Sequence, residues 1–147
     1  MGIILETKGN IFNSQAQTIT VTINTVGAMG KGLARYARDH VPGLYEAYRA
    51  AIKRQEIQID TLWGFTPAEG PQILCFPTKR EWWYPSERVW IEDNLISLVQ
   101  DYKALGIESL AVPPLGCNNG GLNYADDIRE LMYTHLDQLP IPVEIWT

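Results

Sequence analysis

The chain has 147 residues, of which 46% are hydrophobic and 20% are charged, and its net charge is −5. This length suits a single domain, and this composition excludes a disordered or collagen-like chain. No run of residues is long and apolar enough to predict a membrane span, and the first residues lack the basic segment of a secretory signal. Two cysteines and two histidines are too few for a disulfide framework or a typical zinc site. We therefore expect a cytoplasmic protein that needs no metal and does not contact the membrane.

Six short apolar runs predict β-strands. The clearest run, 18–24, alternates strictly and places Ile19, Val21 and Ile23 on one face. The run at 109–113 is too short to show a period and fits a strand that is covered on both faces. The six runs span residues 3–6, 18–24, 59–63, 72–77, 109–113 and 141–146.

Four helical patterns lie between these runs, at about 32–40, 42–51, 86–106 and 123–140. The last begins at Asn123, with Asp126 and Asp127 in the first turn, where carboxylates suit the positive end of a helix. Strands that alternate with helices predict a three-layer α/β domain. Ligands of such domains bind at the carboxyl ends of the strands, so the loops there are the first place to look for a site.

Two glycine-rich loops join a predicted strand to a predicted helix, at 24–34 and at 113–124. Neither matches the spacing of a Walker A loop or of the dinucleotide-binding glycine motif. One such loop alone indicates no more than a tight turn. Two on one sheet edge favour a nucleotide diphosphate, because glycines allow close approach and helix N–H groups hold phosphate.

A third loop, 76–85, carries Lys79 at the end of a predicted strand. We expect Arg80 and the neighbouring tryptophans to lower the pKa of this lysine, and a neutral amine is a nucleophile. The aromatic run Trp82–Tyr84 is either a plug of the core or a platform on which bases stack. Cys117 is an improbable nucleophile because no histidine is placed to activate it.

Charge is unevenly distributed along the chain. Segment 31–54 carries six basic and two acidic residues, whereas the rest of the chain is strongly acidic. Two interpretations stay open: solvated helix faces, or a positive rim beside an anionic ligand.

Taken together, the segments Lys8–Ile11, Gly27–Leu33 and Leu115–Leu122, with Asn24, resemble the macrodomain family over essentially the whole chain. Within that family, Met29–Gly32, Phe76–Lys79 and Leu115–Asn123 are similar to the DarG-type macrodomains and the related terminal ADP-ribose glycohydrolases. The resemblance implies a three-layer α/β/α fold with a central mixed sheet and an ADP-ribose ligand without a cofactor. It also implies removal of ADP-ribose from thymidine in single-stranded DNA, as the antitoxin to a DarT-like toxin.

The resemblance assigns catalysis to Lys79. It puts Asn10 at the adenine-contacting acidic position and Asn24 beside the distal ribose. Gly120 stands where the related animal enzyme is expected to have a catalytic aspartate, so Lys79 is expected to act without that acid. The other residues that the resemblance assigns to ADP-ribose binding are Ile11, Thr25, Gly27, Met29, Gly30, Lys31, Gly32, Leu33, Thr78, Leu115, Gly116, Cys117, Asn118, Asn119, Gly120, Gly121 and Leu122.

Two other functions remain open: hydrolysis of ADP-ribose on protein carboxylates, and binding of ADP-ribose without cleavage. The resemblance also implies that residues 1–147, a single macrodomain, form the N-terminal domain of a longer antitoxin.

Overall fold

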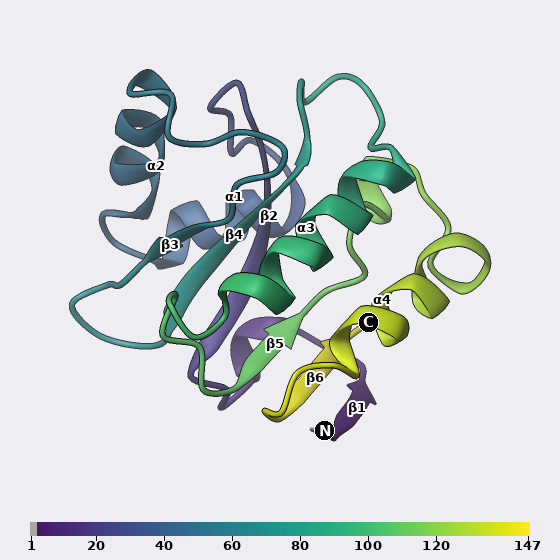
Figure 1. The fold of residues 1–147 in the computed structure, drawn as a ribbon. Coiled ribbons are helices and arrows are strands. Elements are labelled where there is room, and N and C mark those ends of the chain that lie inside the picture. Colours follow the sequence, from purple (N-terminus) through teal and green to yellow (C-terminus); the bar gives the residue numbers. More distant parts are fainter. Residues whose placement is uncertain (1–2) are drawn as a thin grey trace.

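The computed structural model describes residues 3–147, apart from the side chain of Asn118, and contains one twisted sheet (Figure 1). In the described residues the sheet has six strands in the order β1-β6-β5-β2-β4-β3. Neighbouring strands are parallel, except that β3 runs antiparallel to β4, so the sheet is mixed, as predicted. The strands are β1 (Ile4–Thr7), β2 (Thr18–Asn24), β3 (Trp63–Phe65), β4 (Gln72–Lys79), β5 (Leu110–Val112) and β6 (Val143–Trp146).

Helices connect the parallel strands. The α-helices are α1 (Gly32–His40), α2 (Leu44–Lys53), α3 (Arg88–Asp101) and α4 (Arg129–Leu136). Two short 3₁₀ turns, Ile11–Asn13 and Asn118–Gly120, lie in loops. The chain enters α4 through a π-helical turn, Tyr124–Ile128, which begins at the predicted residue: the side chain of Asn123 accepts a hydrogen bond from the Asp126 backbone N–H.

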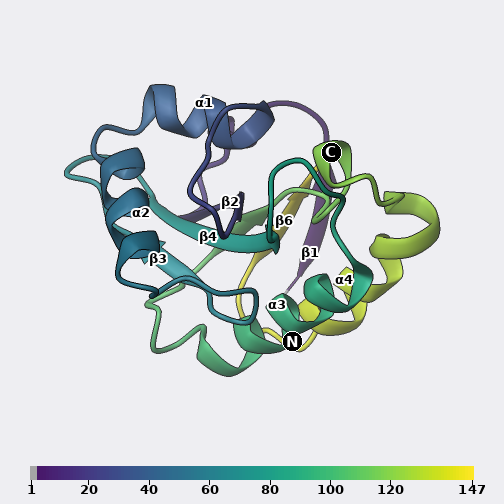
Figure 2. The same cartoon turned by 90° about the horizontal axis from the view of Figure 1, so that it is seen from above.

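The sheet lies between two layers of helices (Figure 2). On one face, Ile19, Val21 and Ile23 pack in a core with Tyr48 and other residues of α1 and α2. On the other face, the buried residues of α3 and α4 form a second core with β4, β5 and β6. The predicted three-layer α/β/α fold is therefore confirmed.

The central position of β2 explains why this strand is buried on both faces. Thr18 and Thr20, which alternate with the three apolar residues, are 0% exposed. β5 is likewise buried throughout, as its unbroken apolar sequence predicted. In β2 the alternation therefore shows which core a side chain faces, whereas the helix layers on both sides of the sheet determine that the whole strand is buried.

The strand predicted at 59–63 is wrong. Residues 59–60 form a turn, and β3 starts at Trp63 and pairs with Cys75 of β4. A residue far along the sequence stabilises this turn: the buried Asn94 of α3 donates a hydrogen bond of 2.9 Å to the Ile59 carbonyl.

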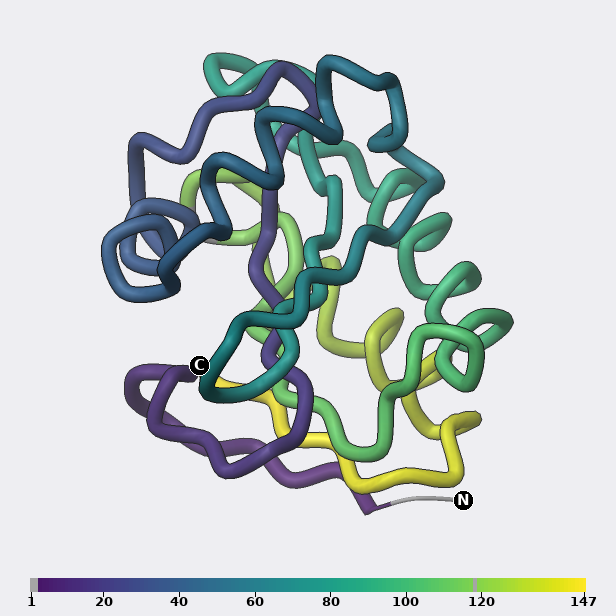
Figure 3. The backbone as a smooth tube through the Cα atoms, turned by 90° about the vertical axis from the view of Figure 1, so that its left-hand side faces the viewer, coloured from purple at the N-terminus to yellow at the C-terminus, as the bar shows by residue number. Residues whose placement is uncertain are grey.

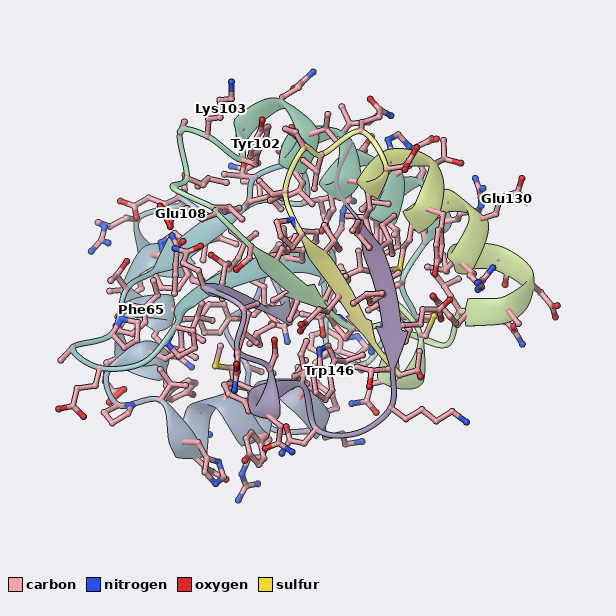
Figure 4. The ribbon with its side chains drawn as sticks, turned by 90° about the horizontal axis from the view of Figure 1, so that it is seen from below. Phe65, Tyr102, Lys103, Glu108, Glu130 and Trp146 are labelled. Carbon is pink, nitrogen blue, oxygen red and sulfur yellow. The ribbon has the colours of Figure 1, made fainter. Side chains whose placement is uncertain are left out.

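The first and last strands lie side by side at one edge of the sheet, although they are far apart in the sequence (Figure 3). Figure 4 shows Trp146 at the end of β6, next to the chain that leaves β1. The Thr147 N–H donates to the Thr7 carbonyl at 2.8 Å and so extends the pairing by one residue. Across residues 3–147, none of the helices is both long enough and apolar enough to span a bilayer.

Candidate active site

A β-bulge at the carboxyl ends of β2 and β4 determines where Lys79 lies. Ile23 pairs with Pro77, but the next residue, Asn24, pairs with Lys79, so Thr78 is the extra residue. Bulges of this kind redirect a side chain at the end of a strand. The Thr25 N–H then donates to the carbonyls of Lys79 and Arg80, at 3.1 and 3.0 Å, which ties the two strand ends together.

A pocket of about 360 Å³ opens at this edge of the sheet. Its walls come from the loops that follow β2, β4 and β5, which are the loops that the sequence singled out. The residues that line it are Thr22, Ile23, Asn24, Ala28, Gly30, Lys31, Gly32, Leu33, Ala34, Thr78, Lys79, Trp82, Pro113, Pro114, Gly116, Cys117, Asn119 and Gly120.

Asn24 organises the first loop. Its Oδ1 accepts hydrogen bonds from the backbone N–H groups of Val26, Gly27 and Ala28, at 3.0–3.2 Å, and from the Tyr48 hydroxyl at 3.0 Å. Its Nδ2 donates to the Ala28 carbonyl at 2.8 Å. Burial raises the pKa of Tyr48, so this hydroxyl stays protonated as a donor. The side-chain carbonyl of Asn24 is thus occupied by hydrogen bonds from its own loop and from Tyr48. A contact of this side chain with a ribose would therefore come from its amide nitrogen.

The first turn of α1 faces the pocket, and its N-cap residue does not cap the free backbone N–H groups with its side chain. Gly32, Leu33 and Ala34 line the pocket, and the preceding residue, Lys31, makes no capping hydrogen bond through its side chain. The first turn contains no acidic residue. A helix start of this kind carries partial positive charge and binds phosphate groups.

The second loop closes the pocket from the opposite side. Asn119 reaches across to α1, since a Cβ atom added to Gly32 would lie 2.7 Å from Asn119 Nδ2. Gly116 has a φ of +72° and packs under Ile91 of α3, which leaves no space for a side chain. Asn118, predicted to contact the ligand, has a side chain outside the described part of the structure.

Lys79 stands at the rim between these loops. Its Nζ donates to the Trp82 carbonyl at 3.2 Å. Partial burial, and next the positive charge of Lys31, lower the pKa of the Lys79 amine. The sequence predicted this direction but assigned part of it to Arg80, whose guanidinium instead lies 5.3 Å from the ring centre of Trp90 and faces away from the lysine. The amine can therefore lose its proton more easily than a free lysine, and neutral amines attack electrophilic carbon.

Many of the predicted site residues line the pocket, but others do not. Asn10 caps a 3₁₀ turn by accepting from the Phe12 N–H, and Met29 and Leu115 are core residues beneath the loops. The remaining predicted residues outside the lining are Ile11, Thr25, Gly27, Gly121 and Leu122. Burial raises the pKa of the Cys117 thiol to about 11, which agrees with its dismissal as a nucleophile.

Several lining residues were missed by sequence reasoning. Thr22 and Ile23 precede the glycine loop, and Pro113 and Pro114 follow directly on β5. Their only signal was their place at the carboxyl end of a predicted strand. Trp82 had been noted in the aromatic run, and the structure puts it in the pocket wall.

The comparisons with known proteins agree with this geometry. No protein-family model matches the chain. A DNA ADP-ribosyl transferase–DNA ADP-ribosyl glycohydrolase fusion protein from Thermosipho africanus is 39% identical, over 95% of this chain and 40% of its own length. The chain thus spans about two-fifths of this curated relative.

Two solved structures are close in fold and in sequence. The macrodomain of Mycobacterium tuberculosis DarG superposes with a TM-score of 0.93 at 35% identity, covering 99% of this chain and 98% of that one. Thermosipho africanus DarTG in complex with ADP-ribose gives a TM-score of 0.90 at 37% identity, covering 97% of this chain and 41% of that one. The chain therefore belongs to the macrodomain family, among the macrodomains of DarG proteins.

Proposed function

We propose that this domain hydrolyses the N-glycosidic bond between ADP-ribose and thymidine in single-stranded DNA, and so acts as the antitoxin to a DarT-like DNA ADP-ribosyltransferase. The family membership supports this function, since a curated relative from Mycobacterium bovis is named a DNA ADP-ribosyl glycohydrolase and Thermosipho africanus DarTG was solved in complex with ADP-ribose. The observation that carries the proposal is Lys79, an amine of lowered pKa at the rim of a pocket suited to a diphosphate.

The pocket offers the diphosphate and the distal ribose of ADP-ribose complementary environments. The diphosphate fits between the uncapped start of α1 and the loop that contains Asn119, where N–H groups and Lys31 supply positive potential. This orientation directs the distal ribose toward the bulge, so that its anomeric carbon approaches Lys79. The thymine ring then projects out of the pocket, where the rest of a DNA strand has room.

Lys79 then acts as the nucleophile in two steps. The neutral amine attacks the anomeric carbon, the carbon–thymine bond breaks, and its electron pair leaves on the thymine ring, where two carbonyls delocalise the charge. The proton that the lysine nitrogen sheds neutralises the departing thymine. The ribosyl-lysine opens to an imine, water adds to the carbon, and the carbon–nitrogen bond breaks to release ADP-ribose and the free amine. The sum is thymidine and ADP-ribose from substrate and one water.

The sequence is also proposed to be one part of a longer protein that acts in the cytoplasm. The curated relative is about two and a half times as long as the region that this chain matches. Both cysteines, Cys75 and Cys117, are free thiols, as expected in a reducing compartment.

Substitution of Lys79 tests the mechanism. Lys79→Ala should bind ADP-ribose with the Kd of the wild-type domain but lose at least about 100-fold in kcat on ADP-ribosylated single-stranded DNA. Lys79→Arg should fail similarly, because the guanidinium stays protonated and cannot attack. Since only the neutral amine attacks, wild-type kcat/KM should rise with pH toward the lowered pKa of Lys79. Borohydride should trap an adduct on Lys79 during turnover.

Three outcomes would contradict the proposal. Near-normal kcat in Lys79→Arg would limit the lysine to electrostatic stabilisation of the departing base. Release of ADP-ribose from protein carboxylates but not from DNA would show that the domain acts on modified proteins instead. Tight binding of ADP-ribose with no release from either substrate would identify a reader domain.

A further inference from the structure

Three consecutive aromatic residues stand exposed beside the pocket. Trp82, Trp83 and Tyr84, here called the aromatic lip, are 52%, 55% and 59% exposed. They follow Lys79 in the loop between β4 and α3. Their exposure excludes the core-plug interpretation of this run. Adjacent large aromatic side chains that remain in water mark a surface that another molecule covers.

The aromatic lip is fixed to both walls of the pocket. At its start, the Trp82 carbonyl accepts the hydrogen bond from Lys79 Nζ, and the Trp82 side chain lines the pocket. Just beyond its end, the Ser86 N–H donates to the Gly120 carbonyl of the second glycine loop at 2.8 Å. The lip therefore continues the surface that binds ADP-ribose.

The rings of the lip face in different directions. Trp82 and Trp83 meet edge to face, with ring centres 5.4 Å apart and planes at 86°, and Trp83 and Tyr84 are tilted by 50°. Neither pair is stacked face to face, so ring faces remain for contacts with another molecule. Charge around the lip is mixed: Lys31 and Lys79 line the pocket, and Glu81 and Glu87 flank the loop.

We propose that the aromatic lip stacks against the bases next to the modified thymidine in a single DNA strand. This inference rests on the proposed function, because a nucleotide held at Lys79 brings its neighbours along by covalent linkage. Unpaired bases present flat faces that stack on tryptophan and tyrosine without regard to sequence. The cations on the pocket side complement the phosphates between those bases. A single strand meets both demands, whereas a duplex hides its base faces.

Trp83→Ala is the informative variant, because Trp83 belongs to the lip and does not line the pocket. It should lower kcat/KM about 10-fold on an ADP-ribosylated single-stranded oligonucleotide. It should leave turnover of ADP-ribosyl-thymidine nucleoside and the Kd for free ADP-ribose unchanged. Trp83→Phe should retain most of the activity on the oligonucleotide. Ile96→Ala, at an exposed apolar residue of α3, is the matched control and should change nothing.

A binding measurement separates this inference from the proposed function. An unmodified oligothymidylate should quench tryptophan fluorescence of the wild-type domain and do so several-fold more weakly in Trp83→Ala. If neither substrate is cleaved but this difference is seen, the proposed function fails and the lip remains a base-stacking surface. If Trp83→Ala binds the oligothymidylate and cleaves both substrates as the wild type does, the inference is wrong. Intact oligonucleotide turnover with lost binding to a DarT-like protein would also overturn it, in favour of a protein-docking surface.

Discussion

Gly30 and Gly116 belong to the two pocket loops, but different constraints require glycine at each. Gly30 lines the pocket, and a Cβ atom added there would have no atom within 4 Å. A Cβ atom on Gly116 would lie 2.8 Å from Ile91 Cδ1 and 2.9 Å from Leu122 Cδ1, on a backbone with φ of +72°. The first glycine leaves room for the ligand, and the second lets the protein pack.

Alanine at each position should separate these roles. Gly30→Ala should weaken ADP-ribose binding about 10-fold, since a methyl group enters the ligand space, while the free energy of unfolding stays equal or rises by about 0.5 kcal/mol. Gly116→Ala should lower the free energy of unfolding by about 2 kcal/mol through overpacking and backbone strain. Calorimetric titration and urea unfolding of both variants measure the two quantities. A stability loss in Gly30→Ala equal to that in Gly116→Ala would contradict the assignment.

Among the elements, β1 is joined to the helical layer by one carboxylate. Glu6 Oε2 accepts hydrogen bonds from Arg129 Nη2 at 2.7 Å and from the Tyr133 hydroxyl at 2.6 Å, and Oε1 accepts from the Tyr124 hydroxyl at 3.0 Å. The hydrogen bond from Tyr133, and then those from Arg129 and Tyr124, lower the pKa of Glu6 against the opposing effect of burial. The edge strand therefore depends on an ionised Glu6.

This dependence predicts a pH effect on stability. Because the folded-state pKa of Glu6 lies below its ordinary value of 4.5, its contribution is complete above that value and is lost as pH falls through the lowered pKa. Glu6→Gln should thus lower the free energy of unfolding by about 1 kcal/mol near pH 7, after allowance for solvent screening, and by much less near pH 3. Urea unfolding at both pH values measures the difference.

Glu56→Gln serves as the control for Glu6→Gln, because Glu56 pairs with Arg54 on the open surface, where ion pairs contribute little. A pH profile of Glu6→Gln that parallels the wild type over the whole range would rule out the role of this carboxylate.

Two strands, β2 and β3, show which parts of the fold could be predicted from the sequence. Alternation at 18–24 was sufficient for β2, because side chains of a strand point to alternate faces whatever lies above them. The strand at Trp63–Phe65 was misplaced, because its position depends on pairing with β4 and on the reach of Asn94 from α3. Such distant contacts leave no local pattern.

The same distinction holds for the candidate site. Glycines and a lysine at strand ends identified the three loops correctly, since the carboxyl edge of a parallel sheet brings them together. The bulge at Thr78 was not predictable, because a register shift is a property of two strands and not of one. The hydrogen bonds to the Asn24 side-chain carbonyl could not be predicted for a related reason. One of them comes from the Tyr48 hydroxyl, which belongs to α2.

Over the whole molecule, the positive segment 31–54 is less available to DNA than its sequence indicates. Arg35 pairs with Asp39 at 3.2 Å, and the guanidinium of Arg38 lies 4.0 Å from the ring centre of Tyr45. Arg54 pairs with Glu56, just outside the segment. Of the six basic residues, Lys31 alone lines the pocket. The interpretation as solvated helix faces fits most of the segment.

Weak salt dependence should follow from this arrangement. Once Lys79 is replaced by alanine, Lys31 is the cation that still lines the pocket, so log Kd of that variant for a single-stranded substrate should change with log salt by a slope of about 1 or less in magnitude. Fluorescence titrations of the Lys79→Ala variant with modified oligonucleotide across a salt series measure this slope. A steeper slope would support the other interpretation of segment 31–54, a positive rim beside the ligand. In that case, charge reversal at Arg35 and Arg38 would reduce the slope.

The pairing of β1 with β6 has a consequence for synthesis on the ribosome. Ile4 pairs with Val143, so within residues 3–147 the partner of β1 is β6, which follows it at the far end of the domain sequence. Until β6 has been made, β1 has unpaired backbone groups next to Ile3 and Leu5, which stay exposed even in the folded domain, and such a segment tends to associate with other chains. The sheet can grow around β2 and β4 during translation, but its β1 edge stays open until β6 has been made.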